Sequence, residues 1–270
     1  MLKLAVIGAQ TLLGRELVQV LEAAEASVLP LSTGPLTVEQ EESDIVVFAP
    51  TPALLVGMDV AILADTPDEH LLEHFPGRIL DLRADGGEGE AMPFGAWPEG
   101  VKRLRLRPAL EQVLGLVPKL LSGVGGVSGT WLRSVAYRGD TGLEALHAQT
   151  KQILKGEDPE TEALGYRAAF EVIPQAPRGA LTEVRVPAFH GDLLVLQVRA
   201  AAGAKLAMAD APEGVAWAPA PPSSREVATS PDLLAYLALG EDHTMGTLIL
   251  GFDPILWGAM RPTLAVLGLK

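Results

Sequence analysis

Three ionisable side chains interrupt an apolar, strand-like run, VRVPAFHGDLLVLQV (184–198). Arg185 could hold a small anion, while His190 and Asp192 could carry protons in a reaction. If the chain is extended there, His190 and Asp192 lie on the same face of the strand. For each of these three residues, a purely structural role is the alternative to a functional one. Arg185 would then pair with Glu183 or Asp192. His190 would be a satisfied or surface histidine, and Asp192 a turn-forming acid after glycine.

A glycine-rich turn, GAQTLLG, follows the first apolar run of the chain. Gly8 and Gly14 stand where a dinucleotide-binding turn needs its first and last glycine, but Thr11 takes the middle position. The β-branched side chain of Thr11 would lie where the phosphates are expected. Two interpretations stay open: a turn that binds a nucleotide, and a turn that keeps only the architecture. The residues of this candidate cofactor site are Gly8, Gln10, Thr11, Leu12, Leu13, Gly14 and Ser32.

The elements that would position these groups follow from the apolar pattern. Continuous apolar runs are typical of strands covered on both faces, and here they alternate with helical segments. The expected strands are 2–7, 27–31, 44–49, 59–64 and 78–82. This alternation predicts an α/β fold that begins with a doubly wound parallel sheet. Residues 84–100 are expected to form a loop that leaves the sheet.

The later part of the chain predicts a second, mixed sheet with one strong helix. Its strand-like runs are 127–137, 182–187, 193–198 and 246–252. Thr141 and Glu144 form a capping box that would begin the helix, and Lys155–Gly156 would end it. The proline-rich segment 209–231 is expected to be irregular. In KRLRLR (102–107), alternate arginines would share one strand face, which we interpret as solvated or as an interface.

Composition excludes several classes of function. The formal net charge of −13 would repel DNA or RNA. No run reaches the roughly 20 apolar residues of a membrane span, and the amino terminus resembles no leader, so we expect no membrane association and a cytoplasmic location. The five histidines form no compact ligand motif, and no metal site is expected. The absence of asparagine and the 21 prolines fit either a thermophile or a GC-rich genome.

The chain also contains no cysteine. Disulfide bonds, thiolate metal sites and catalysis by a thiol are therefore excluded.

Three stretches resemble the aspartate-semialdehyde dehydrogenase family. GLEALHAQTKQILKGE (142–157) is similar to its helix with an E-x-L-x-x-Q-T core, AAFEVIPQ (168–175) to its A-F-x-V-I-P-Q, and VRVPAFHGD (184–192) to its V-R-V-P-x-x-x-G-H. The resemblance runs from the first residue to the last. It implies a Rossmann-type dinucleotide-binding domain at 1–108, to which a C-terminal helix within 256–270 returns. It also implies an α+β substrate and dimerisation domain at 109–255.

The resemblance implies reductive dephosphorylation of aspartyl phosphate with NADPH, through a thioacyl enzyme. Most of the residues for that chemistry do not match. The nucleophile position falls on Leu110, and the base position after Gly191 falls on Asp192, with His190 two residues earlier. Arg185 matches the arginine that holds the substrate carboxylate.

Several altered segments favour a homologue that is inactive in the family reaction. It would keep the fold and a homodimer, with weak NADP binding or a small anionic ligand at Arg185. The first alternative is an active NADP-dependent oxidoreductase on an aldehyde or keto acid, which would use Arg185, His190 and Asp192 without a covalent thioester. The second alternative is a regulatory or scaffold partner of an active paralogue. The sequence names neither a substrate nor a partner.

Overall fold

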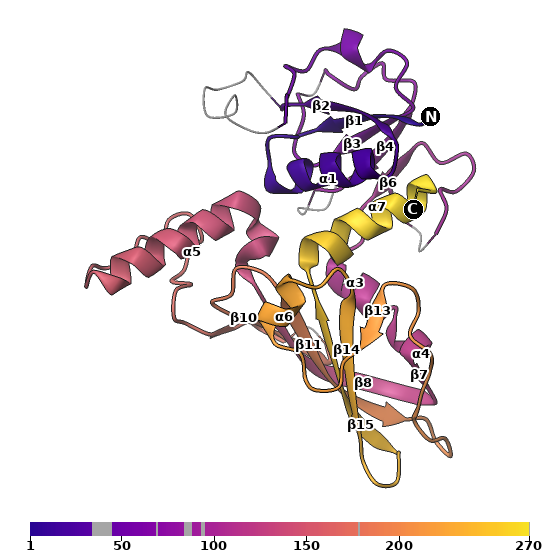
Figure 1. The fold of residues 1–270 in the computed structure, drawn as a ribbon, viewed down its shortest axis with the longest axis vertical. Coiled ribbons are helices and arrows are strands. Elements are labelled where there is room, and N and C mark those ends of the chain that lie inside the picture. The colour runs from indigo at the N-terminus through magenta and orange to yellow at the C-terminus, as the bar shows by residue number, and fades with distance from the viewer. Residues whose placement is uncertain (34–44, 69, 84–87, 93–94, 178, 270) are drawn as a thin grey trace. The chain divides into compact units, whose positions relative to one another are not determined.

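The computed structural model describes residues 1–33, 45–68, 70–83, 88–92, 95–177 and 179–269 (Figure 1). The chain forms two compact units. Unit 1 comprises Met1–Pro108 together with Gly258–Lys270, and unit 2 comprises Ala109–Trp257. The C-terminal helix therefore belongs to the same unit as the first strand.

Unit 1 is built on a parallel sheet with six strands in the described residues. In sheet order these are β2 (Ser27–Leu31), β1 (Lys3–Ile7), β3 (Val60–Leu63), β4 (Arg78–Asp81), β6 (Arg103–Arg105) and β5 (Glu90–Ala91). Its helical segments are α1 (Leu12–Ala23), the 3-10 turn η1 (Pro52–Leu55) and α7 (Arg261–Leu267), which follows the π-helical turn η3 (Leu256–Met260). β1 lies between β2 and β3, so the strand order reverses at β1, as expected for a doubly wound, Rossmann-type sheet.

The apolar runs of unit 1 form strands because helices and turns cover the sheet. All residues of β3 are buried, and β1 is buried from Leu4 onward. Helix α1 buries Leu17 and Leu21, which lie four residues apart on one face of the helix. Leu55 and Leu71 pack in one core cluster with residues of the central strands.

Unit 2 is built on a mixed sheet with seven strands among the residues described. In sheet order these are β13 (Val215–Trp217), β14 (Leu233–Leu239), β15 (Met245–Phe252), β11 (Asp192–Ala200), β8 (Val124–Arg133), β10 (Leu181–Arg185) and β9 (Ile173–Pro174). The pairs β8–β10 and β13–β14 are parallel, and the other neighbours are antiparallel. A separate two-stranded sheet pairs β7 (Leu121–Ser122) with β12 (Ala207–Met208).

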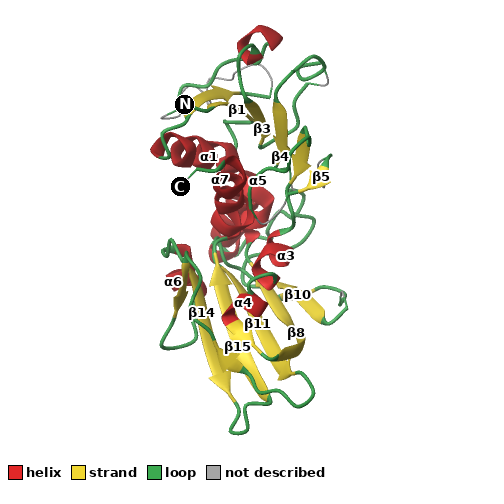
Figure 2. Ribbon diagram, turned by 90° about the vertical axis from the view of Figure 1, so that its right-hand side faces the viewer, coloured by secondary structure: helices red, strands yellow, loops and turns green. Residues whose placement is uncertain are grey.

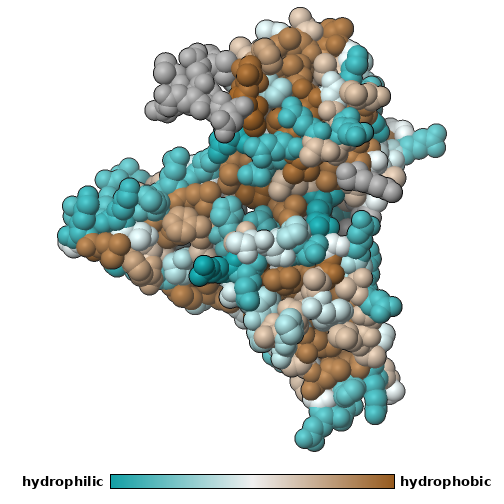
Figure 3. Space-filling view, viewed as in Figure 1, coloured by the Kyte–Doolittle hydropathy of each residue, from teal (hydrophilic) through white to brown (hydrophobic). Residues whose placement is uncertain are grey.

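One face of the unit 2 sheet is covered by α3 (Ala109–Leu114) and α4 (Val117–Leu120), as Figure 2 shows. Val117 and Leu120 pack in the same core cluster as Leu194 and Leu250. The other helical segments of the unit are η2 (Val135–Arg138), α5 (Gly139–Leu154) and α6 (Ser224–Ala228). In Figure 3, polar side chains cover the upper side of the α5 region and apolar ones lie beneath.

Two expectations about elements were wrong. In 44–49, residue 44 lies outside the described residues, and the rest forms no strand but a single bridge between Leu31 and Phe48. Helix α5 begins at Gly139, so Thr141 lies inside its first turn and does not cap it. The helix packs directly on η2, since a Cβ at Gly142 would lie 2.4 Å from Val135 O.

The proline-rich segment 209–231 is also more ordered than expected. It contains β13 and α6, and α6 begins with a capping box between Ser223 and Glu226. The loop expected at 84–100 adds the short strand β5, while 84–87 and 93–94 lie outside the described residues. No helix among the residues described has the length and apolar character of a membrane span.

Candidate functional site

The glycine turn of unit 1 connects β1 to α1 and depends on two glycines for its shape. Gly8 has a φ of +91°, a conformation that L side chains rarely adopt. A Cβ at Gly14 would lie 2.1 Å from Gly8 O. Both glycines are therefore required by the turn itself, whether or not a ligand binds there.

Thr11, in the middle position, closes this turn with its own side chain. It is the N-cap of α1, and its Oγ1 accepts a hydrogen bond from Gly14 N at 3.1 Å. The same hydroxyl donates to Gly8 O at 2.8 Å. Leu12 and Leu13 follow as partly buried residues in the first turn of the helix.

The other residues of the candidate cofactor site bond within the protein. Gln10 Nε2 donates to Thr33 Oγ1 at 2.8 Å, and Thr33 Oγ1 lies 3.5 Å from Asp65 Oδ2. Ser32 is buried, and its hydroxyl donates to Phe48 O at 3.4 Å. The sequence singled out Gln10 and Ser32 but missed Asp65, which follows β3.

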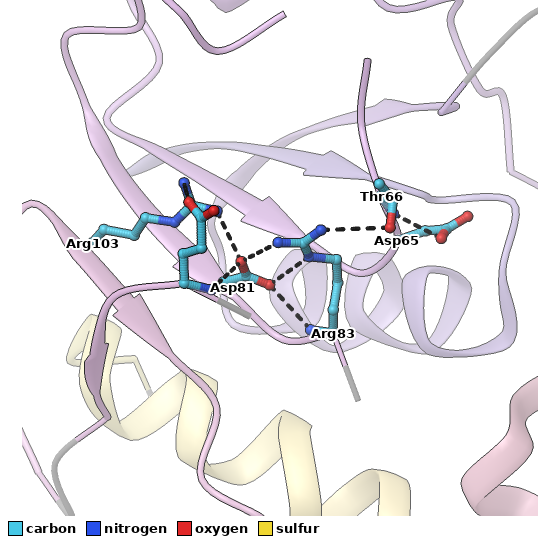
Figure 4. Close-up of polar contacts among 6 residues, drawn as sticks. Asp65, Thr66, Asp81, Arg83 and Arg103 are labelled. Carbon is cyan, nitrogen blue, oxygen red and sulfur yellow. Dashed lines mark hydrogen bonds and ion pairs between the residues drawn. The ribbon is translucent and has the colours of Figure 1, made fainter. Parts of the chain in front are cut away.

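Asp81, at the carboxyl end of β4, is fully buried and binds two arginines (Figure 4). Arg83 Nη2 and Arg103 Nη2 lie 2.7 Å and 2.9 Å from its Oδ2. Burial opposes ionisation, but the hydrogen bonds from Arg83 and Arg103 outweigh it and hold the pKa of Asp81 below its ordinary value. Of the two roles expected for the face of 102–107, a solvated face or an interface, the solvated one is therefore wrong at Arg103, which pairs with a buried carboxylate.

Arg185, on β10 of unit 2, lies in a cluster of arginines and aromatic rings. Its Nε lies 3.5 Å from Glu183 Oε1, so the expected pairing with Glu183 is present. Arg133 shares this partner, with Nη1 3.3 Å from Glu183 Oε2. The guanidinium of Arg185 lies 4.8 Å from the ring centre of Tyr166, and that of Arg133 lies 3.8 Å from the ring centre of Tyr137.

The two tyrosines of this cluster are in contact through their hydroxyl groups, 3.5 Å apart. Burial, followed by the hydrogen bond with Tyr137, raises the pKa of Tyr166 to about 12. Tyr166 therefore stays neutral in the physiological range. Within the cluster, the two guanidinium groups share one carboxylate, that of Glu183.

Gln149 fixes the backbone segment that bears Tyr166. This buried residue of α5 belongs to the E-x-L-x-x-Q-T-like motif. Its Oε1 accepts from Ala168 N at 2.7 Å, and its Nε2 donates to Tyr166 O at 3.2 Å. The motif glutamine thus has a structural function within unit 2.

Asp192 is fully buried at the start of β11 and has its own set of donors. Its Oδ1 accepts from Ser134 N at 2.9 Å and from Ser134 Oγ at 2.7 Å, and its Oδ2 accepts from Trp131 Nε1 at 2.9 Å. Burial outweighs these bonds and raises the pKa of Asp192 to about 6. The turn-forming role expected for Asp192 is wrong, because the buried carboxylate holds β8 and β11 together.

His190 does not share a face with Asp192. Gly191 between them has a φ of +84°, so the chain is not extended there. The His190 side chain is about one third exposed, and its Nδ1 lies 3.3 Å from Asp253 Oδ2. Asp253 Oδ1 accepts from Ile255 N and Leu256 N at 2.8 Å and 2.9 Å. This carboxylate therefore orients the imidazole, and the sequence had not pointed to it.

Leu110 lies in α3 and packs against the core of unit 2. Its neighbours in that cluster include Val113 and Val117. Its aliphatic side chain offers no atom that could attack a carbonyl group. In the described part of the chain, no three His, Asp or Glu side chains gather closely enough to bind a metal ion.

No family model and no curated relative matches this chain. Solved structures match it over nearly its full length. A probable aspartate-semialdehyde dehydrogenase from Pseudomonas aeruginosa is 17% identical, with a TM-score of 0.73, covering 98% of this chain and 97% of that one. Aspartate semialdehyde dehydrogenase II from Vibrio cholerae is 16% identical, with a TM-score of 0.73, covering 98% of this chain and 97% of that one. Aspartate semialdehyde dehydrogenase from Francisella tularensis is 15% identical, with a TM-score of 0.74, covering 99% of each chain.

The chain has the fold of the aspartate-semialdehyde dehydrogenases. At this level of identity the likeness concerns the fold alone. It agrees with the two sheets that the sequence predicted, including the Rossmann-type first sheet.

The partners Asp65 and Asp253 carry weak sequence signals. Asp65 directly follows the end of a buried parallel strand, a position where polar side chains often face a ligand crevice. Asp253 precedes Pro254 and a helical segment, which is typical of a capping acid. Neither signal identifies the side chain that each carboxylate contacts.

Proposed function

We propose that this chain is a homologue of the aspartate-semialdehyde dehydrogenases without their catalytic activity, which keeps the fold and acts as a homodimer that binds a small anion. The observation that carries this proposal is the combination of a shared fold over 98–99% of the chain with the complete absence of cysteine. A thioacyl intermediate requires a thiolate, and Leu110, the residue at the matched position, packs in a core.

The proposed anion site is the cluster around Arg185. Arg133 and Arg185 share Glu183, so one positive charge is not balanced by that carboxylate. Both arginine side chains are about one quarter exposed, so a carboxylate could reach them. A carboxylate bound by two guanidinium groups gains charge-assisted hydrogen bonds.

Calorimetric titration with aspartate tests this site. We expect weak binding, which Arg185→Ala abolishes. Arg167→Ala is the matched control, because Arg167 is more exposed and pairs with Glu171 along the chain. Equal binding by wild type and Arg185→Ala would remove the anion site from the proposal.

The proposed dimer uses the second face of the unit 2 sheet. One row across its strands consists of Thr130, Val195, Ile249 and Tyr236, which are aligned in register. All four side chains stay partly exposed in one chain, while the opposite face is buried by α3 and α4. β-Branched and aromatic side chains in such a row are suited to a self-complementary contact. An active paralogue could pair through the same face, and a co-expression pull-down tests that hypothesis.

The His190–Asp253 pair favours one alternative, an oxidoreductase without a thioester. A carboxylate that orients an imidazole is a common arrangement for proton transfer. Asp192 supports this alternative less, because its oxygens already accept bonds from Ser134 and Trp131. A screen of aldehydes and keto acids with NADPH tests it. Turnover that is lost in His190→Ala would favour the enzyme, and no turnover above background would favour the inactive homologue.

NADP has no role in this proposal. The fold implies a dinucleotide at the glycine turn, but the residues there do not fit its phosphates, because Gln10 Nε2, the Thr11 hydroxyl and the Gly14 amide already bond within the protein. Gln10 Oε1 is buried without a partner among the described residues, but it is an acceptor and cannot bind a phosphate oxygen.

A further inference from the structure

We infer that the carboxyl edge of the unit 1 sheet is closed by Gln10, Thr11, Thr33 and Asp65, and that it does not accept the pyrophosphate of a dinucleotide. This inference goes beyond the proposed function. It concerns binding in unit 1, whereas the proposal concerns catalysis and the surfaces of unit 2.

The position of β1 in the sheet defines where a dinucleotide would bind. In doubly wound sheets the ligand lies outside the carboxyl ends of the strands, at the point where the strand order reverses. Here β1 has β2 on one side and β3 on the other. The pyrophosphate of a bound dinucleotide would therefore lie over the turn that begins at Gly8.

A bridge of side chains crosses this place. Thr33 follows β2 and Asp65 follows β3, so they come from opposite sides of β1, on strands roughly 10 Å apart. Their Oγ1 and Oδ2 atoms are nevertheless only 3.5 Å apart. Gln10 joins from the turn itself, with Nε2 2.8 Å from Thr33 Oγ1. The three side chains thus span the end of β1.

Four amide groups of the turn are also engaged. The amides of Gly8 and Ala9 both donate to Leu31 O, at 2.9 Å and 3.0 Å. The amide of Thr11 donates to Gly8 O at 3.0 Å, and that of Gly14 to the hydroxyl of Thr11 at 3.1 Å. Pyrophosphate binding at a helix N-terminus relies on such amides. A phosphate would have to displace Thr11 before it could use the amide of Gly14.

Charge near the turn does not compensate for this closure. Asp65 packs against Gly8 so closely that a Cβ on Gly8 would lie 2.7 Å from Asp65 Cβ. Its carboxylate would repel a phosphate group. Arg15 carries a positive charge at the turn, but its Nη1 donates to Gln10 O at 2.6 Å. The charges of Asp65 and Arg15 offset each other in their effect on a phosphate group. The hydrogen bonds of the turn therefore decide whether a phosphate can bind there.

Calorimetric titration of the intact chain with NADP⁺ and NAD⁺ tests the inference. For wild type we expect no binding tighter than about 1 mM. The double variant Thr11→Gly/Asp65→Ala removes both the capping hydroxyl and the bridging carboxylate, and we expect it to bind NADP⁺ at least about tenfold more tightly. Glu22→Ala is the control, because this exposed acid lies near the other end of α1. It should behave as wild type.

Three outcomes would overturn the inference. Wild-type binding of NADP⁺ tighter than about 1 mM would show that the edge is open. A folded double variant without any gain would show that Thr11 and Asp65 do not close it. A change in hydrogen exchange at residues 8–15 of wild type on addition of NADP⁺ would also contradict the inference. If the double variant does not fold, Asp65→Ala alone replaces it in the test for tighter NADP⁺ binding. Binding without turnover would leave the proposed inactive homologue intact.

Discussion

Asp253 Oδ2 lies 3.3 Å from His190 Nδ1, and this contact joins the segment before β11 to the segment after β15. The other oxygen of the same carboxylate accepts the amides of Ile255 and Leu256. Asp253 therefore orients a histidine and caps the start of the C-terminal helical segment at the same time.

Replacing Asp253 should destabilise unit 2. Burial opposes its ionisation, but the hydrogen bonds from His190 and the two amides prevail and hold the pKa of Asp253 below its ordinary value. We expect Asp253→Ala to lower the free energy of unfolding by about 1–3 kcal/mol at pH 7. Because the folded pKa is depressed, this stabilisation is complete above about pH 4 and is lost as the pH falls further. Urea unfolding between pH 2.5 and pH 7 measures it.

Asp158→Ala is the control for this experiment, since Asp158 is exposed. A loss equal to that of the control, or a loss that grows as the pH falls, would contradict the capping function of Asp253.

Asp192 should give the opposite dependence on pH. Its pKa is raised to about 6, first by burial. The folded state therefore holds the proton more strongly than the unfolded state between about pH 4 and pH 6. Across that window the contribution of Asp192 to stability falls by about 3 kcal/mol as the pH rises. Relative to Asp192→Asn, wild type should gain stability from pH 7 to pH 4, and urea unfolding of both proteins measures the difference. A difference that is constant with pH would exclude a raised pKa.

Gln149 should be essential for the order of the segment that bears Tyr166. Gln149→Leu leaves the buried amides of Ala168 and Ala169 without their acceptor, so we expect a loss of about 2–4 kcal/mol. Faster proteolysis within 158–172 should accompany it. His147→Leu, on the exposed side of the same helix, should change neither quantity. Equal proteolysis of the two variants would argue against this function of Gln149.

The proposed dimer should separate when a charge is placed on the open face of the unit 2 sheet. Ile249→Asp would introduce a carboxylate into both copies of a self-complementary contact, which costs several kcal/mol. Light scattering coupled to size exclusion should then give a monomer. Met208→Asp, on the separate two-stranded sheet, is the matched control and should remain dimeric. Wild type that is monomeric at micromolar concentration would contradict the dimer.

The sequence predicted the central strands because their apolar runs are continuous. β1, β2, β3 and β4 need no tertiary information, since a parallel strand covered on both faces is apolar along its length. The end of α5 was predicted as well, from the glycine that follows Lys155. In the structure Gly156 adopts a φ of +78°, which is typical of a glycine just after a helix. The beginning of α5 was not, because packing on η2 overrides the capping box at Thr141.

The candidate sites were less predictable, because partners distant in sequence decide the role of each charged residue. Arg103 looked solvated until the buried Asp81 was found 2.9 Å away. Asp192 depends on Ser134 and Trp131, both on or after β8, and no local pattern links them. The replacement of the middle glycine by Thr11 was visible in the sequence, but the bridge to Asp65 was not.

The direct measurement of the central claim is the rate at which purified protein forms NADPH from aspartate semialdehyde, phosphate and NADP⁺. We expect no rate above the protein-free background, because the chain has no thiol to form the thioacyl bond. An ordinary enzymatic rate, about 1 s⁻¹ or more, would contradict it.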